Sequence, residues 1–365
     1  MVIDYRPPNI NILTTVDAVL ELEADWQRLL EATGNDALHM SWPWVSTWLD
    51  IYGRDSRVRP AVIVVRNNGA IQGIAPLMIV RKRSRLGFPY RELRFLCEGG
   101  EISFDYMDFL QSPESPQNVH ELLIQSIWDL QFDTLALCKT RNRDLPGALG
   151  GGGPQSAGVS PVASLGEDWE SYLAGRSSKF RSNLKRYQRK CERHGEISYL
   201  RVPDDINFED GFKHLVALNR ERWGEEGDSF RTSQYGRFQR RVASDALSEG
   251  RLWLRFLSVG DQIAAAKYNI VYAGRMYSLQ AGRLPQFSKC GIGHLLNSYI
   301  FQEAISNGIH AVDFLPGTGY HKEAWADDEV PLFQSRGRSS TIRGMALRLE
   351  GSIKKAYRRL KKRQT

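Results

Sequence analysis

The segment Phe287-Ser288-Lys289-Cys290-Gly291-Ile292-Gly293 governs the interpretation of this sequence. Its glycines precede a stretch that ends at Asn307-Gly308, which predicts a helix over residues 292–306. An apolar strand is expected directly afterwards, from Ile309 to Leu315. A loop that leads into a helix presents free backbone N–H groups, which commonly hold pyrophosphate. The segment is therefore expected to bind a phosphate-bearing donor.

The strand exits through Pro316-Gly317 into Tyr320-His321-Lys322-Glu323-Ala324-Trp325. Polar groups just past a strand end are where α/β proteins tend to place their chemistry. A helix start that can bind phosphate, beside such polar groups, suggests a transferase that binds a phosphate-bearing acyl donor.

The bulk composition is that of an ordinary soluble globular protein, with 365 residues, 42% of them apolar and 25% charged. The first eight residues lack the apolar core of a signal peptide, so a cytoplasmic location is expected. Four well-separated cysteines and histidines without paired spacing give no metal motif, so no metal site is expected.

The net charge of +7 is concentrated in two clusters, over residues 176–193 and 348–363. Such clusters favour an anionic partner, which can be a nucleotide-bearing cofactor, RNA or an acidic membrane surface. Apolar residues also alternate with cations at near-helical spacing from Leu347 to Leu360, as in helices that lie on membranes. The alternative is a solvated helix face and a soluble basic tail.

The sequence divides into two similar halves at a segment rich in glycine and proline, Leu145 to Gly158, which predicts neither a helix nor a central strand. We expect an N-terminal domain over residues 1–145, a linker over 146–160, a C-terminal domain over 161–335 and a basic tail or helix over 336–365.

In each half the sequence pattern indicates a helix, antiparallel strands, a second helix and a further strand. This order predicts α/β domains with mixed, mostly antiparallel sheets flanked by helices. The opening helices are expected at Val19–Leu30 and Phe212–Trp223. The later helix of the first half follows the segment Gln111 to Gln117. This segment contains no glycine and is therefore poorly suited to binding phosphate. Donor binding is therefore assigned to the second half, and a substrate or scaffold role to the first.

Several segments, taken in order, resemble the CelD-like acetyltransferase domain family of the GNAT superfamily, which is related to the tandem FemAB-type transferases. They are Leu218-Asn219-Arg220-Glu221-Arg222-Trp223, Gly260-Asp261-Gln262-Ile263-Ala264, the segment 287–293, Asp313-Phe314-Leu315-Pro316-Gly317 and Tyr320 to Trp325. The match covers about residues 160–330. It departs from the familiar donor loop at Ser288, where Gln or Arg is usual and where neighbouring Lys289 carries the charge instead.

The resemblance implies two tandem GNAT-like domains and direct acyl transfer from acetyl-CoA or another acyl-CoA to the amine of a small molecule or sugar. The implied cofactor-binding residues are Ser288, Lys289, Gly291, Ile292 and Gly293, and the implied substrate-binding residues are Arg222 and Glu221. A FemAB-type transferase that uses aminoacyl-tRNA, and a non-catalytic scaffold at a membrane surface, are the alternatives.

Three candidate catalytic residues follow from the resemblance. Asp313 is expected either to act as a base or orienting group, or to cap the following loop through backbone hydrogen bonds. Tyr320, with an ordinary pKa of about 10, is either the acid for the departing thiolate or a packed aromatic residue. Lys322 is either a ligand of phosphate or of an acidic acceptor, or a surface lysine.

Overall fold

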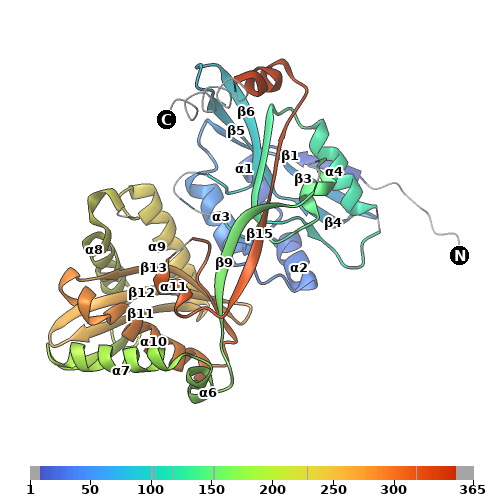
Figure 1. Ribbon diagram of the computed structural model, residues 1–365. Coiled ribbons are helices and arrows are strands. Elements are labelled where there is room, and N and C mark those ends of the chain that lie inside the picture. Colours follow the sequence, from blue (N-terminus) through green and yellow to red (C-terminus); the bar gives the residue numbers. More distant parts are fainter. Residues whose placement is uncertain are drawn as a thin grey trace, which may run out of the picture. The chain divides into compact units, whose positions relative to one another are not determined.

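The computed structural model describes residues 9–350 apart from 100, 101, 103, 117, 151, 152, 228 and 318, and apart from the side chains of 225, 226, 320 and 321. The chain forms two compact units, each of which is described by itself (Figure 1). The first unit comprises Met1–Asn35, His39–Gly158 and Pro331–Thr365, and the second comprises Asp36–Leu38 and Val159–Val330. No helix among the described residues is long and apolar enough to cross a membrane.

The second unit is built on a mixed sheet with the strand order β10-β11-β12-β13-β14-β9. Neighbouring strands are antiparallel except for β13 and β14, which are parallel. Every residue of the central strand β11 is buried, in keeping with its nearly continuous apolar sequence. The strands are β9 (Gln155–Ser164), β10 (Ile197–Arg201), β11 (Leu252–Val259), β12 (Gln262–Tyr272), β13 (Arg275–Arg283) and β14 (Ala311–Asp313).

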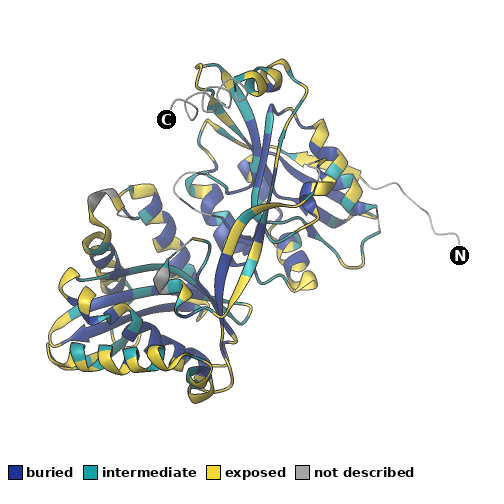
Figure 2. Ribbon diagram, viewed as in Figure 1, coloured by how far each residue is buried: buried dark blue, intermediate teal, exposed yellow. Residues whose placement is uncertain are grey.

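Helices cover both faces of this sheet, with α7 and α10 on one face and α8 and α9 on the other (Figure 1). The α10 face of the sheet holds a core of buried residues (Figure 2). This core includes Trp325, which is fully buried. The helices are α6 (Trp169–Ala174), α7 (Ser178–Glu192), α8 (Phe208–Gly227), α9 (Ser233–Ser248), α10 (Ile292–Ser306) and α11 (Tyr320–Glu323), with the 3-10 helix η2 (Pro285–Cys290) before α10.

On the opposite face, α8 lies directly against β13. A Cβ atom at Gly282 would come within 2.3 Å of the backbone of Leu218, so only glycine allows this approach. The buried amide of Asn219 donates to the Ala281 carbonyl at 3.0 Å and fixes the helix to the strand. Since this contact involves the Leu218–Trp223 segment, it sets the position of Arg222 near the end of β13.

The first unit contains the strands in the order β15-β8-β6-β5-β2 and a separate sheet in the order β1-β3-β4-β7. Its strands are β1 (Asn9–Leu13), β2 (Val58–Pro60), β3 (Val62–Asn67), β4 (Ala70–Ala75), β5 (Leu77–Arg83), β6 (Pro89–Phe95), β7 (Leu110–Gln111), β8 (Thr134–Thr140) and β15 (Asp328–Arg338). Its helices are α1 (Val16–Leu20), α2 (Glu23–Thr33), α3 (Trp42–Ile51), α4 (Val119–Asp129) and α5 (Leu145–Ala148), and a 3-10 turn, η1, covers Leu38–Met40.

The α/β class and the mixed, mostly antiparallel sheets agree with the sequence-based expectation, but several segments differ in detail. The expectation that Leu145–Gly158 forms neither a helix nor a central strand was wrong, because α5 begins at Leu145 and β9, which begins at Gln155, lies inside the sheet between β14 and β15. Pro146 occupies the first turn of α5, where its missing N–H costs nothing. The expected helix Val19–Leu30 is two helices, α1 and α2.

The expected basic tail over residues 336–365 is not a separate element at its start. Residues up to Arg338 belong to β15, and residues 342–350 are helical. Residues 351–365, which carry the remaining cations of the tail, lie outside the described residues.

Candidate functional site

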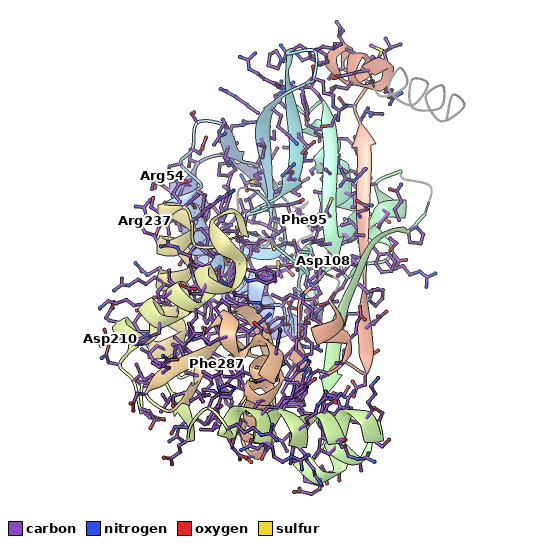
Figure 3. The ribbon with its side chains drawn as sticks, turned by 60° about the vertical axis from the view of Figure 1, so that its left-hand side comes forward. Arg54, Phe95, Asp108, Asp210, Arg237 and Phe287 are labelled. Carbon is purple, nitrogen blue, oxygen red and sulfur yellow. The ribbon has the colours of Figure 1, made fainter. Side chains whose placement is uncertain are left out.

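The helix α10 begins as the sequence predicts, at a glycine that closes η2. Gly291 has φ 75°, a left-handed conformation, and a Cβ atom there would lie 2.2 Å from the ring of Tyr187. Phe287, labelled in Figure 3, is buried in η2. Gly293 is different, because no atom apart from its chain neighbours and the backbone of its own helix lies within 4 Å of the position that its Cβ would take. Gly291 therefore builds the turn, whereas Gly293 leaves open space beside the helix start.

The N-terminus of α10 retains its capacity to bind an anion. Within the described residues, the backbone N–H groups of Ile292 and Gly293 have no backbone acceptor. The Ile292 side chain is fully buried, so this residue can offer only its N–H. Ser288 accepts a hydrogen bond from Arg283 Nε at 2.9 Å, and Lys289 is exposed. The predicted donor-binding residues thus lie together around one helix start.

The sheet opens next to this helix start. The parallel strands β13 and β14 pair only at Arg275–Ala311, Met276–Val312 and Tyr277–Asp313. Strand β13 continues to Arg283, whereas β14 ends at Asp313. Residues 278–283 of β13 therefore present a backbone edge that β14 does not cover, and an extended ligand can pair with such an edge.

A group of cations gathers on the elements around this opening. We call it the cationic cluster, and it comprises Arg222 (α8), Lys267 (β12), Arg283 (β13), His294 (α10) and Lys322 (α11). Burial, followed by the charges of Arg222 and Lys322, lowers the pKa of Lys267 to about 7. Burial and then Arg283 lower the pKa of Arg222 to about 10.

His294 belongs to the same electrostatic group. Burial lowers its pKa, and Lys267 and Arg283 lower it further. Its Nδ1 accepts a hydrogen bond from the indole N–H of Trp325 at 3.0 Å, which leaves Nε2 as the protonated nitrogen of the neutral ring. The ring stacks on Tyr187, which also packs against Gly291.

Within the described residues, no carboxylate forms an ion pair with Arg222, Lys267 or Arg283. Partly buried cations that depress one another's pKa values cost free energy unless an anion joins them. The arrangement is therefore suited to an anion, which the guanidinium groups can meet directly and which Lys267 and His294 can meet by taking up protons. The described residues contain no group of three His, Cys, Asp or Glu side chains suited to a metal ion.

The predicted catalytic residue Asp313 is fully buried at the end of β14 and engaged with neighbours. Its carboxylate accepts hydrogen bonds from Ser160 Oγ and the Leu315 N–H, both at 2.8 Å, and lies 3.7 Å from Arg275 Nη1. Leu315 has a positive φ of 59°, so the bond to its N–H supports a strained turn. This geometry favours the loop-capping interpretation of Asp313.

The other two candidates lie in or beside α11. Lys322 Nζ donates to the carbonyl oxygens of Leu315 at 2.9 Å and Pro316 at 3.4 Å, which holds the loop after β14. It also contributes to the low pKa of Lys267, so it faces the cationic cluster. Tyr320 is the first residue of α11, and its side chain lies outside the described part of the chain.

The two predicted substrate-binding residues, Arg222 and Glu221, lie in different surroundings. Arg222 joins the cationic cluster and stacks over Trp223, with 4.3 Å between the guanidinium carbon and the ring centroid. Glu221 lies on the exposed side of α8. Sequence reasoning missed Lys267, Arg283 and His294. Lys267 was detectable in the sequence as the one cation of the largely apolar stretch Gln262–Val271, but only the fold shows its neighbours.

A cavity of about 360 Å³ borders the site on the α7 side. Its lining includes Arg176, Lys179, Asn183, Tyr187 and His294. The cavity therefore adjoins the start of α10 through His294 and Tyr187, and its polar groups suit a polar ligand.

Comparison with known proteins gives this geometry a context. Residues 178–323 match the family model described as an acetyltransferase (GNAT) domain. No sequence among the curated proteins matches the chain. Similar folds among solved structures include FemX, with a TM-score of 0.54 and 12% identity over 85% of this chain and 93% of that chain.

Two further solved structures share the fold over most of their length. One is a tandem GNAT protein from the clavulanic acid biosynthesis pathway, with a TM-score of 0.51 and 11% identity over 92% of this chain and 100% of that chain. The other is L-PGS from Bacillus licheniformis, with a TM-score of 0.51 and 14% identity over 87% of this chain and 92% of that chain. The expected tandem GNAT-like fold is thus confirmed. Residues 178–323 are similar to GNAT acetyltransferase domains, and this match supports an acyltransferase.

Proposed function

We propose that the second unit transfers an acyl group from acyl-CoA, with acetyl-CoA as the first donor to test, to an amine by direct attack in a ternary complex. The observation that carries this proposal is the cationic cluster beside the open N-terminus of α10. The phosphates of CoA supply the negative charge that these groups lack, and the space beside Gly293 admits a pyrophosphate.

The open edge of β13 suits the rest of the donor. The pantetheine arm is extended and carries amide groups, which can pair with the backbone of residues 278–283 as an added strand does. Backbone N–H groups at this edge can then polarise the thioester carbonyl, whose oxygen gains negative charge as the amine attacks.

The chemistry requires a neutral amine and two proton movements. The amine nitrogen forms a bond to the carbonyl carbon, the carbon–sulfur bond breaks, one proton leaves the nitrogen to a base, and the thiolate accepts a proton. We assign the last step to Tyr320 and donor contact to Lys322. Asp313 is proposed as a positioning residue, because its carboxylate already holds the turn at Leu315. Most of the rate enhancement would come from positioning.

The acceptor is proposed to be an amine-bearing small molecule or sugar. Arg222, which the sequence assigned to the acceptor, lies in the cationic cluster and is proposed to contact the donor instead, so Glu221 is the candidate acceptor ligand. The 360 Å³ cavity beside His294 offers a second polar surface for the acceptor. We also propose membership of the CelD-like branch, on the Leu218–Trp223 and Tyr320–Trp325 signatures, with a cytoplasmic location and a role in polysaccharide or cell-envelope metabolism.

The test is an acyl-transfer assay that follows release of the CoA thiol with a panel of amines. Lys267→Met and Arg283→Met should each weaken acyl-CoA binding at least tenfold. Arg237→Met is the matched control, because Arg237 is an exposed residue of α9 outside the cluster. Equal binding by all three variants would refute the assignment of the donor site.

A second candidate is a FemAB-type transfer from aminoacyl-tRNA. It is favoured by a row of exposed cations on α7, formed by Lys179, Lys185, Arg186 and Arg189. Binding of RNA through such a row would weaken steeply with added salt. Transfer that requires charged tRNA, and that Lys185→Glu/Arg189→Glu abolishes, would support this candidate over acyl-CoA. The third hypothesis, a non-catalytic scaffold at a membrane, predicts that no group is transferred from either donor.

A further inference from the structure

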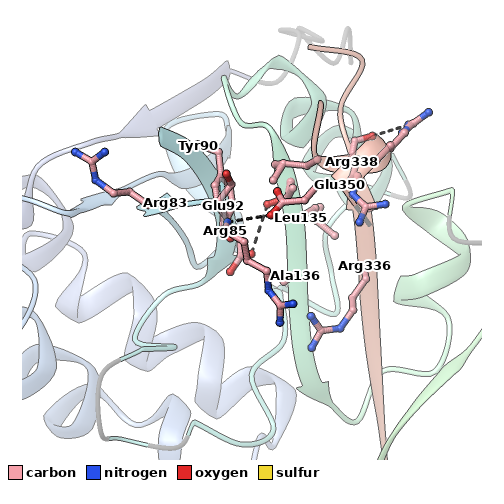
Figure 4. A pocket seen from close by; sticks show the side chains of 14 residues that line it. Arg83, Arg85, Tyr90, Glu92, Leu135, Ala136, Arg336, Arg338 and Glu350 are labelled. Carbon is pink, nitrogen blue, oxygen red and sulfur yellow. Dashed lines mark hydrogen bonds between the residues drawn. The ribbon is translucent and has the colours of Figure 1, made fainter. Parts of the chain in front are cut away.

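A groove that contains several arginines lies in the first unit, outside the proposed acyl-transfer site. Its volume is about 710 Å³, and residues of the β5–β6 turn, β6, β8, β15 and the helix over residues 342–350 line it (Figure 4). Three of its arginines, Arg85, Arg336 and Arg338, carry the argument that follows, and all three are exposed.

The strand pairing places two of these arginines side by side on one face of the sheet. Arg336 and Arg338 are two residues apart on β15, so their Cα atoms lie about 7 Å apart and their side chains share a face. They pair with Ala136 and Thr134 on β8, and Thr134 pairs with Glu92 on β6. The small side chains of Ala136 and Thr134 leave room beside the arginines, and both residues line the groove.

The third arginine belongs to the β5–β6 turn, which is tied to the helix. The backbone N–H of Arg85 donates to Glu350 Oε1 at 3.0 Å. At the other end of this helix, Thr341 Oγ1 donates to the buried carboxylate of Asp133 at 2.8 Å. These bonds leave the guanidinium group of Arg85 available for a ligand, while they hold the turn and the helix in place around the groove.

The guanidinium groups have few partners of their own. Within the part of the chain that the structure describes, Arg85, Arg336 and Arg338 form no ion pair with a carboxylate. Arg336 donates to Gln334 Oε1 at 2.8 Å and to Cys138 Sγ at 3.4 Å, neither of which carries a charge in these surroundings. Most of the hydrogen-bond donors in the groove are therefore open.

The acidic groups in and near the groove do not balance this positive charge. Glu92 forms ion pairs with two cations, neither of which lines the groove. Burial, more than any neighbouring charge, raises the pKa of Glu98, which interacts with Arg336, to about 7, so part of this group is protonated at neutral pH. Glu350 and the ionised share of Glu98 therefore leave an excess of positive charge.

We propose that this groove binds a small organic phosphate, with its phosphate group held by Arg85, Arg336 and Arg338. A phosphate monoester carries nearly two negative charges and three acceptor oxygens, and arginine can offer paired hydrogen bonds to each phosphate. The volume of about 710 Å³ also leaves space for an organic group, which Tyr90 and Leu347 in the lining can contact. The proposal does not rest on the proposed acyl transfer.

The test is protection of individual arginines from phenylglyoxal, which modifies exposed guanidinium groups, measured on the full chain by peptide mass spectrometry. The probe is glycerol 3-phosphate, with glycerol and acetate at equal ionic strength as controls. At a probe concentration about ten times the dissociation constant, modification of the three groove arginines should slow about tenfold. Arg59 and Arg237, which are exposed and outside the groove, should react at an unchanged rate.

Because protection is assigned residue by residue, phosphate bound at the proposed donor site, followed through Arg283, is not mistaken for phosphate in the groove. Arg336→Gln/Arg338→Gln should abolish the protection of Arg85. The charge-matched control, Arg59→Gln/Arg237→Gln, should preserve it. If the β15 variant fails to fold by circular dichroism, Arg85→Gln repeats the test, read through Arg336 and Arg338.

Three results would overturn the proposal. One is that glycerol 3-phosphate protects none of the three arginines. Another is that acetate protects them equally, which would show general screening of charge and no phosphate site. The third is that Arg85 stays protected in Arg336→Gln/Arg338→Gln, which would show that the arginines do not act together.

Discussion

The two glycines at the start of α10 should respond in opposite ways to substitution by alanine. Gly291→Ala places a side chain in the left-handed region, which costs about 1–2 kcal/mol. The new Cβ atom would also lie 2.2 Å from the Tyr187 ring, so that ring must move, at a cost of about 1–3 kcal/mol. Together these effects should lower the free energy of unfolding by about 2–5 kcal/mol.

The methyl group of Gly293→Ala meets no atom within 4 Å beyond its chain neighbours and the backbone of its own helix. The position lies in the first turn of α10, where alanine is favoured over glycine by up to about 1 kcal/mol. The folded state should therefore be equally stable or slightly more stable. The methyl group nevertheless enters the space proposed for the donor pyrophosphate. Affinity for acetyl-CoA should fall about tenfold, which corresponds to about 1.4 kcal/mol.

Urea unfolding and isothermal titration calorimetry with acetyl-CoA separate these effects. Gly291→Ala should lose stability, and Gly293→Ala should lose only affinity. The reasoning is refuted if Gly293→Ala binds acetyl-CoA as tightly as the wild type, or if Gly291→Ala is as stable as the wild type.

The remaining predictions concern protons and the buried carboxylate. The pKa of Lys267 is about 7 in the folded chain, against an ordinary value of 10.5. Between pH 7 and pH 10.5 the unfolded chain therefore binds more protons than the folded chain, so the free energy of unfolding should rise with pH over this window. Lys267→Met should flatten this rise. A bound phosphate should raise the Lys267 pKa, so calorimetry near pH 7.5 in buffers of different ionisation enthalpy should detect proton uptake, absent in Lys267→Met. Asp313→Asn should cost about 1–3 kcal/mol of stability but less than tenfold in kcat, with an unchanged pH profile; a stable variant with kcat a thousandfold lower would instead make Asp313 the base.

Local signals in the sequence were enough to place the donor segment. The glycine at position 291 predicts a turn before an apolar helical stretch, and the structure begins α10 at Ile292. The strand after it was also expected, although β14 covers only Ala311–Asp313. These features depend on residues close together in the chain, which propensity and spacing describe well.

The cationic cluster could not be derived in the same way. Its members come from five elements between residues 222 and 322, and only the packing of α8 against β13 at Gly282 brings Arg222 near Arg283. The error at residues 145–158 has a related cause. Propensity disfavours a strand in a glycine-rich segment, but β9 lies between β14 and β15 in the sheet, so tertiary contacts fix the strand.

The central claim is that the cationic cluster and the start of α10 bind an acyl-CoA. The most direct measurement is thermal unfolding of the wild type, Lys289→Glu and Arg222→Met/Arg283→Met with acetyl-CoA, longer acyl-CoAs and free CoA. At a hundredfold excess over the dissociation constant, binding should stabilise the wild type by about 2.7 kcal/mol, and the variants should lose most of this stabilisation. Absence of stabilisation of the wild type by any CoA species would contradict the account.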